Sequence, residues 1–382
     1  MVGENKQKKI QRKHVRVIFS LLSIIVLTYV SVSLISGRPL GFAWFSNFSA
    51  SRNAVNVADE LFFDVGRDRV FADLDGAIAA VGALGIQSLD YAGNELLRDT
   101  FRMYSPAIRS INSRAIAFDI GGTSVRVFNA DRVLSAVETD GAIISASLNR
   151  NGWFAVNTQE SSGLRGVVTV YNNSGTAVFR VNLGSGYAFS SIISNDNRNL
   201  AVLNLTGEGS RVTLYQGLNQ SELDSEFVFP DELILDLHFL SGGDLLAVST
   251  NALIVLDRNG VSRELFDYSD KRLGGFIISD RDIILHLLDY GVGHSGRLVR
   301  LNDSGNVQAE LEVNRELRSM SFDDGSFAVL WSDGVSLYDN NFNERLVPDE
   351  VLTAGVSRIL SLGSGIALLT GDHSILAVRA QD

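Results

Sequence analysis

The chain has 382 residues, 45% of them apolar and only four of them proline, which is the composition of a globular protein with an ample core. It contains no cysteine, which excludes a disulfide framework, a thiolate zinc site, an iron–sulfur cluster and a cysteine nucleophile. Residues 1–16 carry six cations against Glu4, and the total charge of −11 therefore leaves −16 for the rest. Such an acidic body repels phosphate backbones, so we expect no nucleic-acid partner.

Residues 17–36 form an uncharged apolar run directly after this basic tail. A helix of that length crosses a hydrocarbon core about 30 Å thick. Because the cations lie only on the N-terminal side, we expect residues 1–16 in the cytoplasm and everything after Ser36 outside it. A cleavable signal peptide is the alternative, but its apolar region is usually shorter. The sequence thus predicts a single-pass transmembrane helix in the cell membrane, bound to the lipid bilayer through residues 17–36.

Residues 37–59 are predicted to be a juxtamembrane linker, because they show no sustained strand or helix periodicity. The linker begins with an aromatic cluster of Phe42, Trp44, Phe45 and Phe48. Amphipathic rings prefer the membrane interface, although these rings could instead dock on the following domain. The linker is short, so we expect that domain to lie near the membrane surface.

One phrase recurs about every 40 residues from position 69 to the end. It consists of a small polar turn, an apolar strand and a second strand that closes on Asn, Asp or Gly, as in 147–156 before 168–175 and 321–330 before 335–341. Repetition at this period is typical of propellers and solenoids. Strand signals are dense after residue 60 and helix signals are nearly absent. We therefore expect residues 60–382 to form an all-β domain, an extracytoplasmic β-propeller.

The repeat divides the domain into eight units, although seven blades are possible if the first unit is irregular. The units begin near Arg69, Ala107, Ala142, Tyr187, Leu233, Leu273, Leu317 and Val356. The last unit supplies only three strands, which leaves an open sheet edge. Residues 61–65 form a strand-like segment without a partner of its own, so we expect this segment to pair with the last blade and close the ring.

The phrase Ser321-Phe-Asp-Asp-Gly before an apolar strand resembles the inner-strand turn of WD-repeat and PQQ-like propellers. An anchor followed by a propeller resembles an uncharacterised family of bacterial, mostly Gram-positive, membrane-anchored propeller proteins, over residues 17–382. The Trp-Asp dipeptide of WD repeats is missing, and Trp331-Ser-Asp comes nearest. The tryptophan-docking motif of PQQ enzymes is also missing, so the resemblance implies no quinone, and we expect no cofactor.

Two further motifs suggest chemistry that the repeat explains more simply. Residues 118–131 are similar to the phosphate-binding loop of sugar kinases, but they fall where other units place a strand, a turn and a strand. Gly121 and Gly122 are then a hairpin turn. The phrase at 321–325 partly matches the Asp-box of sialidases, and we expect a turn held by its own Asp and Ser side chains.

The histidines, His14, His238, His286, His294 and His373, show no metal-ligand spacing, and no nucleophile elbow is present. We therefore assign no metal site and no catalytic residue. His286 alternates within an apolar strand and is expected to be a core or rim residue with satisfied hydrogen bonds. Whether the chain is an enzyme stays open, and the sequence favours a non-enzyme.

Polar residues of the innermost strands should face the channel of a propeller. They are Arg109, Asp236, His238, Arg318 and Arg358. Arg318 and Arg358 lie at the same distance from a following serine in neighbouring units, which suggests an anion or glycan contact at the channel mouth. Ion pairing between blades is the alternative.

Two functions follow from these observations. The first is a membrane-tethered, non-catalytic interaction or scaffold domain at the cell envelope, with an envelope protein or a glycan as its partner. The second is a cell-surface hydrolase or lyase that acts on glycans through a pair of carboxylates at the channel mouth. The sequence singles out no such pair.

Overall fold

The computed structural model describes residues 58–380 apart from 160–165, 185, 219–221, 231, 280–281, 292, 346–353 and 372–373. These residues belong to the second of two compact units, Asn56–Asp382. The predicted tail, the transmembrane helix at 17–36 and the aromatic cluster lie outside the described residues, as does nearly all of the linker. Within the part of the chain that the structure describes, no helix is long and apolar enough to cross a membrane.

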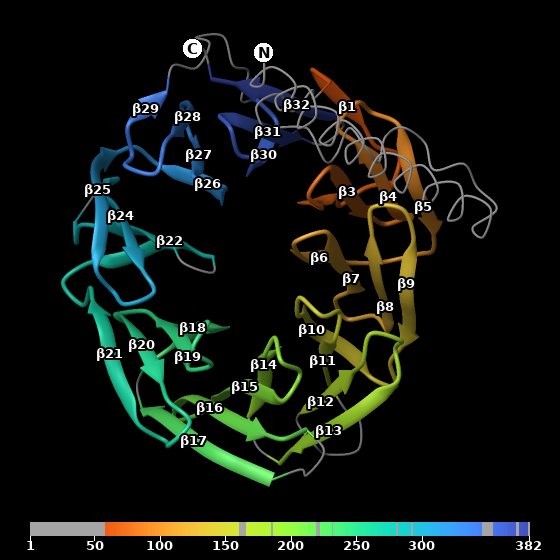
Figure 1. Cartoon of the computed structure of the whole chain (residues 1–382), viewed down its shortest axis with the longest axis vertical. Helices are drawn as coiled ribbons and strands as arrows, with labels where there is room; N and C mark the ends of the chain where they lie inside the picture. Colours follow the sequence, from red (N-terminus) through yellow and green to blue (C-terminus); the bar gives the residue numbers. More distant parts are fainter. Residues whose placement is uncertain are drawn as a thin grey trace, which may run out of the picture. The chain divides into compact units, whose positions relative to one another are not determined.

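The unit Asn56–Asp382 is an eight-bladed β-propeller, as predicted, and each blade is a four-stranded antiparallel sheet around a central opening (Figure 1). The innermost strands are β2 (Val70–Asp73), β6 (Pro106–Ile111), β10 (Ala142–Leu148), β14 (Tyr187–Ile193), β18 (Ile234–Phe239), β22 (Arg272–Ile278), β26 (Leu317–Asp323) and β30 (Val356–Ser361). They define blades 1 to 8 in chain order. Each begins within one residue of the predicted start of its unit.

The other strands complete the blades outward. The second strands are β3 (Ala77–Gly82), β7 (Arg114–Asp119), β11 (Phe154–Gln159), β15 (Asn199–Thr206), β19 (Leu245–Ser249), β23 (Asp282–Leu288), β27 (Ser326–Trp331) and β31 (Ile366–Gly371). The third strands are β4 (Gly85–Asp90), β8 (Ser124–Asn129), β12 (Gly166–Tyr171), β16 (Gly209–Gln216), β20 (Ala252–Leu256), β24 (Ser295–Asn302), β28 (Gly334–Tyr338) and β32 (Ser374–Arg379). The outermost strands are β5 (Glu95–Thr100), β9 (Val133–Glu138), β13 (Ala177–Leu183), β17 (Glu222–Pro230), β21 (Ser262–Asp267), β25 (Val307–Asn314), β29 (Glu344–Arg345) and β1 (Glu60–Phe62).

Antiparallel order gives the ring two distinct faces. Every innermost strand begins on the face where one blade is joined to the next, which we call the connection face. Every innermost strand ends on the opposite face, in the hairpin that leads to its second strand, and we call this the turn face. The hairpins between second and third strands return to the connection face. The order and direction of the strands therefore determine on which face each loop lies.

The core lies between blades rather than within them. Strands β3 and β27 are buried along their whole length, whereas the outermost strand β25 alternates between exposed and half-buried residues. Apolar side chains from successive blades pack face to face, as Phe128 of blade 2 does against Ala79 of blade 1. Burial on both faces explains why the second strands read as continuous apolar runs. Each blade thus depends on its neighbours for its core.

Strand β1 is the outermost strand of the last blade, although it comes first in the chain. It pairs antiparallel with β32, and Leu61 lies opposite Ile375. The ion pair between Arg379 and Asp59, at 2.9 Å, extends the contact. The strand is shorter than the expected 61–65, because Phe63 and Val65 turn away from β32 and are buried beside blade 1, where Phe63 packs edge-on against Phe71.

Replacing Leu61 with alanine should destabilise the entire ring, because its side chain is only 2% exposed and belongs to the strand that hides the last sheet edge. We expect the free energy of unfolding to fall by about 2–4 kcal/mol in a single cooperative transition. Urea unfolding followed by tryptophan fluorescence measures this change.

The neighbouring Phe62 is 65% exposed on the same strand and provides a matched control. Phe62→Ala should change the free energy of unfolding by less than about 0.5 kcal/mol. Equal stabilities of Leu61→Ala and Phe62→Ala would show that the closing strand does not hold the ring together.

Candidate functional site

The innermost strands share a bulge that fixes their height in the channel. In six blades, the pairing with the second strand skips one residue near the start of the innermost strand. The skipped residues are Ile144, Phe189, Leu235, Gly274, Arg318 and Ser357. Bulges bend a strand and re-aim its side chains. The six bulges all lie near the starts of their strands, at a similar height in the channel close to the connection face.

The position directly after the bulge links neighbouring innermost strands. The hydroxyl of Ser145 donates to the carbonyl oxygen of Phe189 at 2.9 Å. The hydroxyl of Ser319 accepts a hydrogen bond from the backbone N–H of Ile359 at 3.2 Å. A serine at this position therefore satisfies backbone groups of the next blade, whereas a longer polar side chain there has to extend elsewhere.

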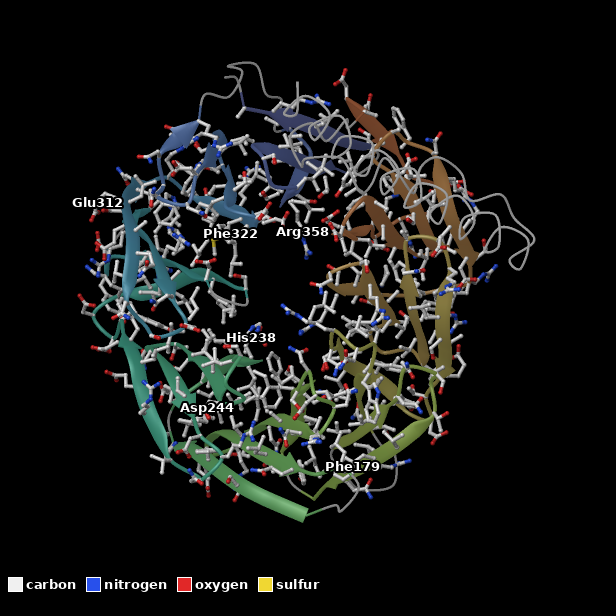
Figure 2. All side chains as sticks on the ribbon, in the orientation of Figure 1. Phe179, His238, Asp244, Glu312, Phe322 and Arg358 are labelled. Carbon is white, nitrogen blue, oxygen red and sulfur yellow. The ribbon has the colours of Figure 1, made fainter. Side chains whose placement is uncertain are left out.

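Two of the predicted channel residues form a direct pair. His238 Nε2 lies 3.3 Å from Asp236 Oδ2, and both side chains are partly buried at the edge of the channel, where Figure 2 shows His238. Burial alone would raise the pKa of Asp236. The hydrogen bond and charge of His238, the charge of Arg109 and the N–H of Leu237 outweigh burial and hold this pKa below its ordinary value. Asp236 is therefore a carboxylate at neutral pH.

Arg109 is an exposed residue of β6 in blade 2. Its charge lowers the pKa of Asp236 in blade 5, so the structure brings Arg109, Asp236 and His238 within electrostatic reach of one another. The sequence placed Arg109 on a different innermost strand from Asp236 and His238 and could not show that their charges interact. Across the channel they form a mixed-charge group.

Arg318 and Arg358 do not share one structural position, although their spacing from serine is the same. Arg318 is the bulged residue of its strand, whereas Arg358 follows the bulge at Ser357 and matches Asp236 in register. The bulge shifts one strand against the other by a residue, which sequence spacing cannot reveal. Both arginines are exposed, and Figure 2 shows Arg358 beside the central opening.

Ion pairing between blades does not account for these two arginines within the described residues. No described carboxylate lies within 4.0 Å of the guanidinium of Arg318 or Arg358. Elsewhere in the ring, by contrast, Arg126 of blade 2 pairs with Asp99 of blade 1 at 3.7 Å. Arg272, the first residue of β22, is exposed in the same way, and the sequence analysis missed it. Its position at the start of an innermost strand was the available signal.

Acidic side chains gather at the opposite end of the channel. Asp73 ends β2 in blade 1, and its carboxylate accepts a hydrogen bond from the hydroxyl of Tyr91 at 2.7 Å. Burial raises the pKa of Asp73 to about 6, and the charges of Asp323 and Asp75 act in the same direction, while the Tyr91 hydrogen bond opposes them. Asp73 and Asp323 thus interact across blade 8. The glycan-hydrolase hypothesis stays a prediction, and these carboxylates are its available candidates.

His286 is a core residue, as expected, but its hydrogen bonds are not satisfied by the described residues. Its side chain is 2% exposed, and neither ring nitrogen has a hydrogen-bond partner there. The ring lies edge-on to Trp331 of the next blade, with the centroids 6.4 Å apart. Burial lowers the pKa of His286 to about 4, and the charges of Arg272 and His294 add to this shift. The imidazole is therefore neutral at pH 7.

The two motif-like sequences serve the fold. Gly121, with φ of 81°, and Gly122 form the hairpin between β7 and β8, and a Cβ on Gly122 would collide with the carboxylate of Asp119. That carboxylate accepts hydrogen bonds from the N–H groups of Tyr104 and Ser105. In the Asp-box-like turn, the hydroxyl of Ser321 accepts from the N–H of Ser361, so it joins blades 7 and 8 instead of holding its own turn.

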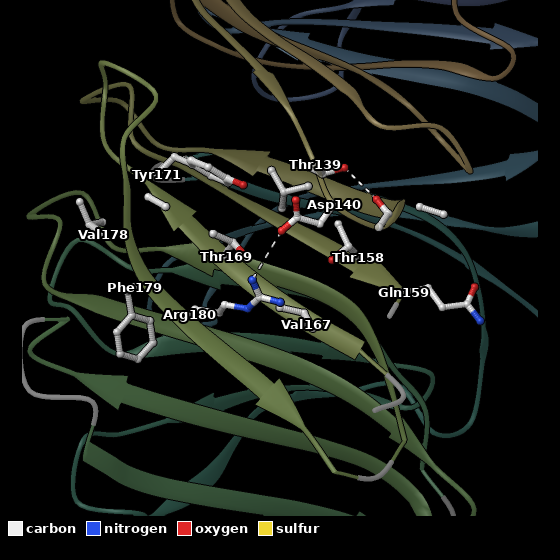
Figure 3. A pocket seen from close by; sticks show the side chains of 14 residues that line it. Thr139, Asp140, Thr158, Gln159, Val167, Thr169, Tyr171, Val178, Phe179 and Arg180 are labelled. Atoms are coloured by element: carbon white, nitrogen blue, oxygen red, sulfur yellow. Dashed lines mark hydrogen bonds and ion pairs between the residues drawn. The ribbon is translucent and has the colours of Figure 1, made fainter. Parts of the chain in front are cut away.

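A crevice of about 820 Å³ lies on the face of blade 3 (Figure 3). Its floor is formed by strands β11, β12 and β13, and an ion pair of 3.8 Å between Arg180 and Asp140 crosses it. Burial raises the pKa of the Tyr171 hydroxyl at its edge, and the charge of Asp140 adds to this. Asp140 is the one carboxylate that lines the crevice within the described residues, so the crevice itself offers no acid–base pair.

No group of three or more acidic or histidine side chains in the described part of the chain is placed to hold a metal ion.

Replacing Asp73 with asparagine should stabilise the protein at neutral pH. The raised pKa means that stability is lost as the pH rises from about 3.8 to about 6, because the native state then buries a charge. We expect Asp73→Asn to raise the free energy of unfolding by about 2 kcal/mol at pH 7 and by much less near pH 4. Urea unfolding at the two pH values measures it. Asp131→Asn removes the same charge from an exposed turn, and an equal gain in this control would contradict the argument.

The contribution of His286 to the free energy of unfolding should depend on pH in the opposite direction to that of Asp73. A lowered pKa contributes stability that is complete above pH 6.5 and is lost as the pH falls towards about 4. We expect the stability of His286→Leu relative to the parent to rise by about 2–3 kcal/mol between pH 7 and pH 4. Both proteins should carry Asp73→Asn, since Asp73 titrates in an overlapping range. Parallel stability curves for the two proteins would refute the role of His286.

Comparisons with known proteins support the fold. The C-terminal WD40 domain of Sif2 is similar over 86% of this chain and 96% of its own, with 13% identity and a TM-score of 0.53. BamB from Moraxella catarrhalis is similar over 85% of this chain and 98% of its own, with 15% identity and a TM-score of 0.52. No curated protein sequence matches the chain. Residues 53–365 match a family described as a family of unknown function, DUF5711, and the chain belongs to that family.

Proposed function

We propose that this protein is a non-catalytic interaction scaffold, held at the cell envelope by the anchor predicted at residues 17–36, and that its connection face receives a protein partner. A closed ring in which every blade shares its core with its neighbours is a rigid support for loops. Binding residues commonly lie on loops that a rigid framework positions. The similar solved structures are compatible with this role and carry no further argument for it.

The observation that carries the proposal is the position of the exposed tyrosines. Tyr104, Tyr187 and Tyr290 are 86%, 54% and 67% exposed. Tyr104 lies in the connection between blades 1 and 2, Tyr187 begins β14, and Tyr290 follows β23. All of these positions belong to the connection face. Tyrosine is enriched in protein interfaces, where it buries a large apolar ring and keeps a polar tip.

Smaller apolar side chains enlarge the same surface. Leu84, Ile120 and Leu233 are 50%, 45% and 45% exposed, and all of them lie in connection-face loops. A surface that mixes apolar and tyrosine side chains with polar loops fits a folded protein better than a bare glycan chain. The glycan partner is kept as the other possible outcome of the experiment.

The turn face has a different character, because its polar side chains are used within their own turns. The side-chain oxygen of Asn149 accepts hydrogen bonds from the N–H groups of Asn151 and Trp153. The same pattern of i+2 and i+4 donors recurs at Asp90, Asn172, Asp257, Asn302 and Asp339. These turns are rigid and leave few side-chain groups for a partner.

The chain also enters the ring at the rim of the turn face. The N–H of Ala58 donates to the carbonyl oxygen of Tyr91, which lies in the turn-face hairpin between β4 and β5. Strand β1 then runs from the turn face to the connection face. Ala58 therefore lies on the face opposite to the proposed partner surface.

The test replaces Tyr104, Tyr187 and Tyr290 by serine in the full chain, in cells that make it, and compares chemical crosslinking with that of the parent. We expect a specific crosslinked protein to be lost or reduced at least tenfold, because tyrosines are enriched among the few interface residues that carry most of the binding energy. The urea midpoint of the purified variant should stay that of the parent, since all these rings are exposed.

Val261, which is 58% exposed in a turn-face hairpin, provides the matched control, and Val261→Ser should leave the crosslink unchanged. A chain without residues 1–36, examined in parallel, reports whether the anchor is needed for the encounter. An undiminished crosslink in the tyrosine variant would overturn the connection face as the partner surface, and capture of a glycan in its place would overturn the protein partner.

A further inference from the structure

Three arginines at the connection-face end of the channel have no carboxylate partner among the described residues. Arg272, Arg318 and Arg358 come from the successive blades 6, 7 and 8, and each lies within two residues of the bulge in its innermost strand. All of them are exposed, and none pairs with a described carboxylate within 4.0 Å. In a domain with a large excess of carboxylates, unpaired guanidinium groups at one place are unexpected on electrostatic grounds.

The strands that carry these arginines are in direct contact at this level. A Cβ on Gly275 would lie 3.2 Å from the side chains of Leu317 and Met320, so β22 packs closely on β26. The hydrogen bond from Ile359 to Ser319, at 3.2 Å, joins β30 to β26. Arg318 and Arg358 directly precede Ser319 and Ile359, and they therefore flank one seam between blades 7 and 8.

Two carboxylates near the connection-face end are already engaged, Asp236 by His238 and Asp333 by Arg315. Asp333, in the hairpin after β27, is bound by Arg315 at 2.7 Å. Asp73 and Asp323 lie at the turn-face ends of their innermost strands. The three arginines thus lie at the connection-face end, where Asp236 is paired with His238, whereas Asp73 and Asp323 lie at the turn-face end. An anion that enters the channel from the connection face therefore meets these arginines first.

We propose that the connection-face end of the channel binds an oxyanion ligand, which bears phosphate or carboxylate groups, through Arg318 and Arg358, with Arg272 as an additional contact. A guanidinium group offers a planar fork of N–H donors that matches both kinds of oxyanion. Figure 2 shows the side chain of Arg358 directed into the central opening, where such a ligand would lie. The site is independent of the tyrosine surface and does not require the protein partner.

The test measures binding of pyrophosphate and of citrate to the full chain in detergent by isothermal titration calorimetry at low salt. The variant is the double substitution Arg318→Gln and Arg358→Gln. We expect the parent to bind at least one of these probes and the variant to bind it at least tenfold more weakly, with the affinity of the parent falling as salt is added. The preferred probe identifies the ligand as phosphate-bearing or carboxylate-bearing.

The matched control is Arg132→Gln with Arg263→Gln, which removes the same charge from exposed arginines outside the channel. This control should bind like the parent. The absence of binding to both probes, or equal weakening in the control and the channel variant, would overturn the proposal. The tyrosine variant should keep its probe binding, so failure of the oxyanion site and failure of the scaffold role give different results.

Discussion

The ring depends on the removal of its last free sheet edge. Seven blades are continuous in the chain, but the eighth would end with the unpaired strand β32 if Glu60–Phe62 did not return to it. An unpaired edge exposes backbone donors and acceptors that must find a partner, within the molecule or outside it. Because each blade builds its core with its neighbours, an open edge at one blade would weaken the packing around the whole circle.

Closure also determines what the channel can contain. Small side chains such as Ser145 and Ser319 bring neighbouring innermost strands together through side-chain hydrogen bonds to the backbone. Larger groups replace them at the matching register position in two blades, where Asp236 pairs with His238 and Arg358 points into the central opening. The polar groups that face the channel are therefore the side chains of the innermost strands that the packing between blades does not use. The charged side chains of the channel include Arg318 and Arg358 near the connection face and Asp73 and Asp323 at the turn face.

Much of the fold could be predicted from the sequence, because a strand that is buried on both faces leaves an apolar run and a tight turn leaves Gly, Asn or Asp. These signals predicted the start of every blade within one residue. The bulges could not be predicted, since a skipped residue changes pairing without changing composition. For that reason Arg318 and Arg358 looked equivalent in spacing but differ in register. The coupling of Asp236 to Arg109, and the unsatisfied ring of His286, depend on contacts between blades that no local pattern records.

Strand β1 has a mechanical consequence, because it is the first strand of the described residues and closes the ring. A force applied before Ala58 reaches the hydrogen bond of Ala58 to Tyr91 in blade 1, the ion pair of Asp59 and Arg379 and the three residue pairs between β1 and β32 before it reaches any other blade. Strand β1, which closes the ring, is thus also the strand on which such a force acts. A pull strong enough to peel it away would open the propeller at the seam between its last and first blades.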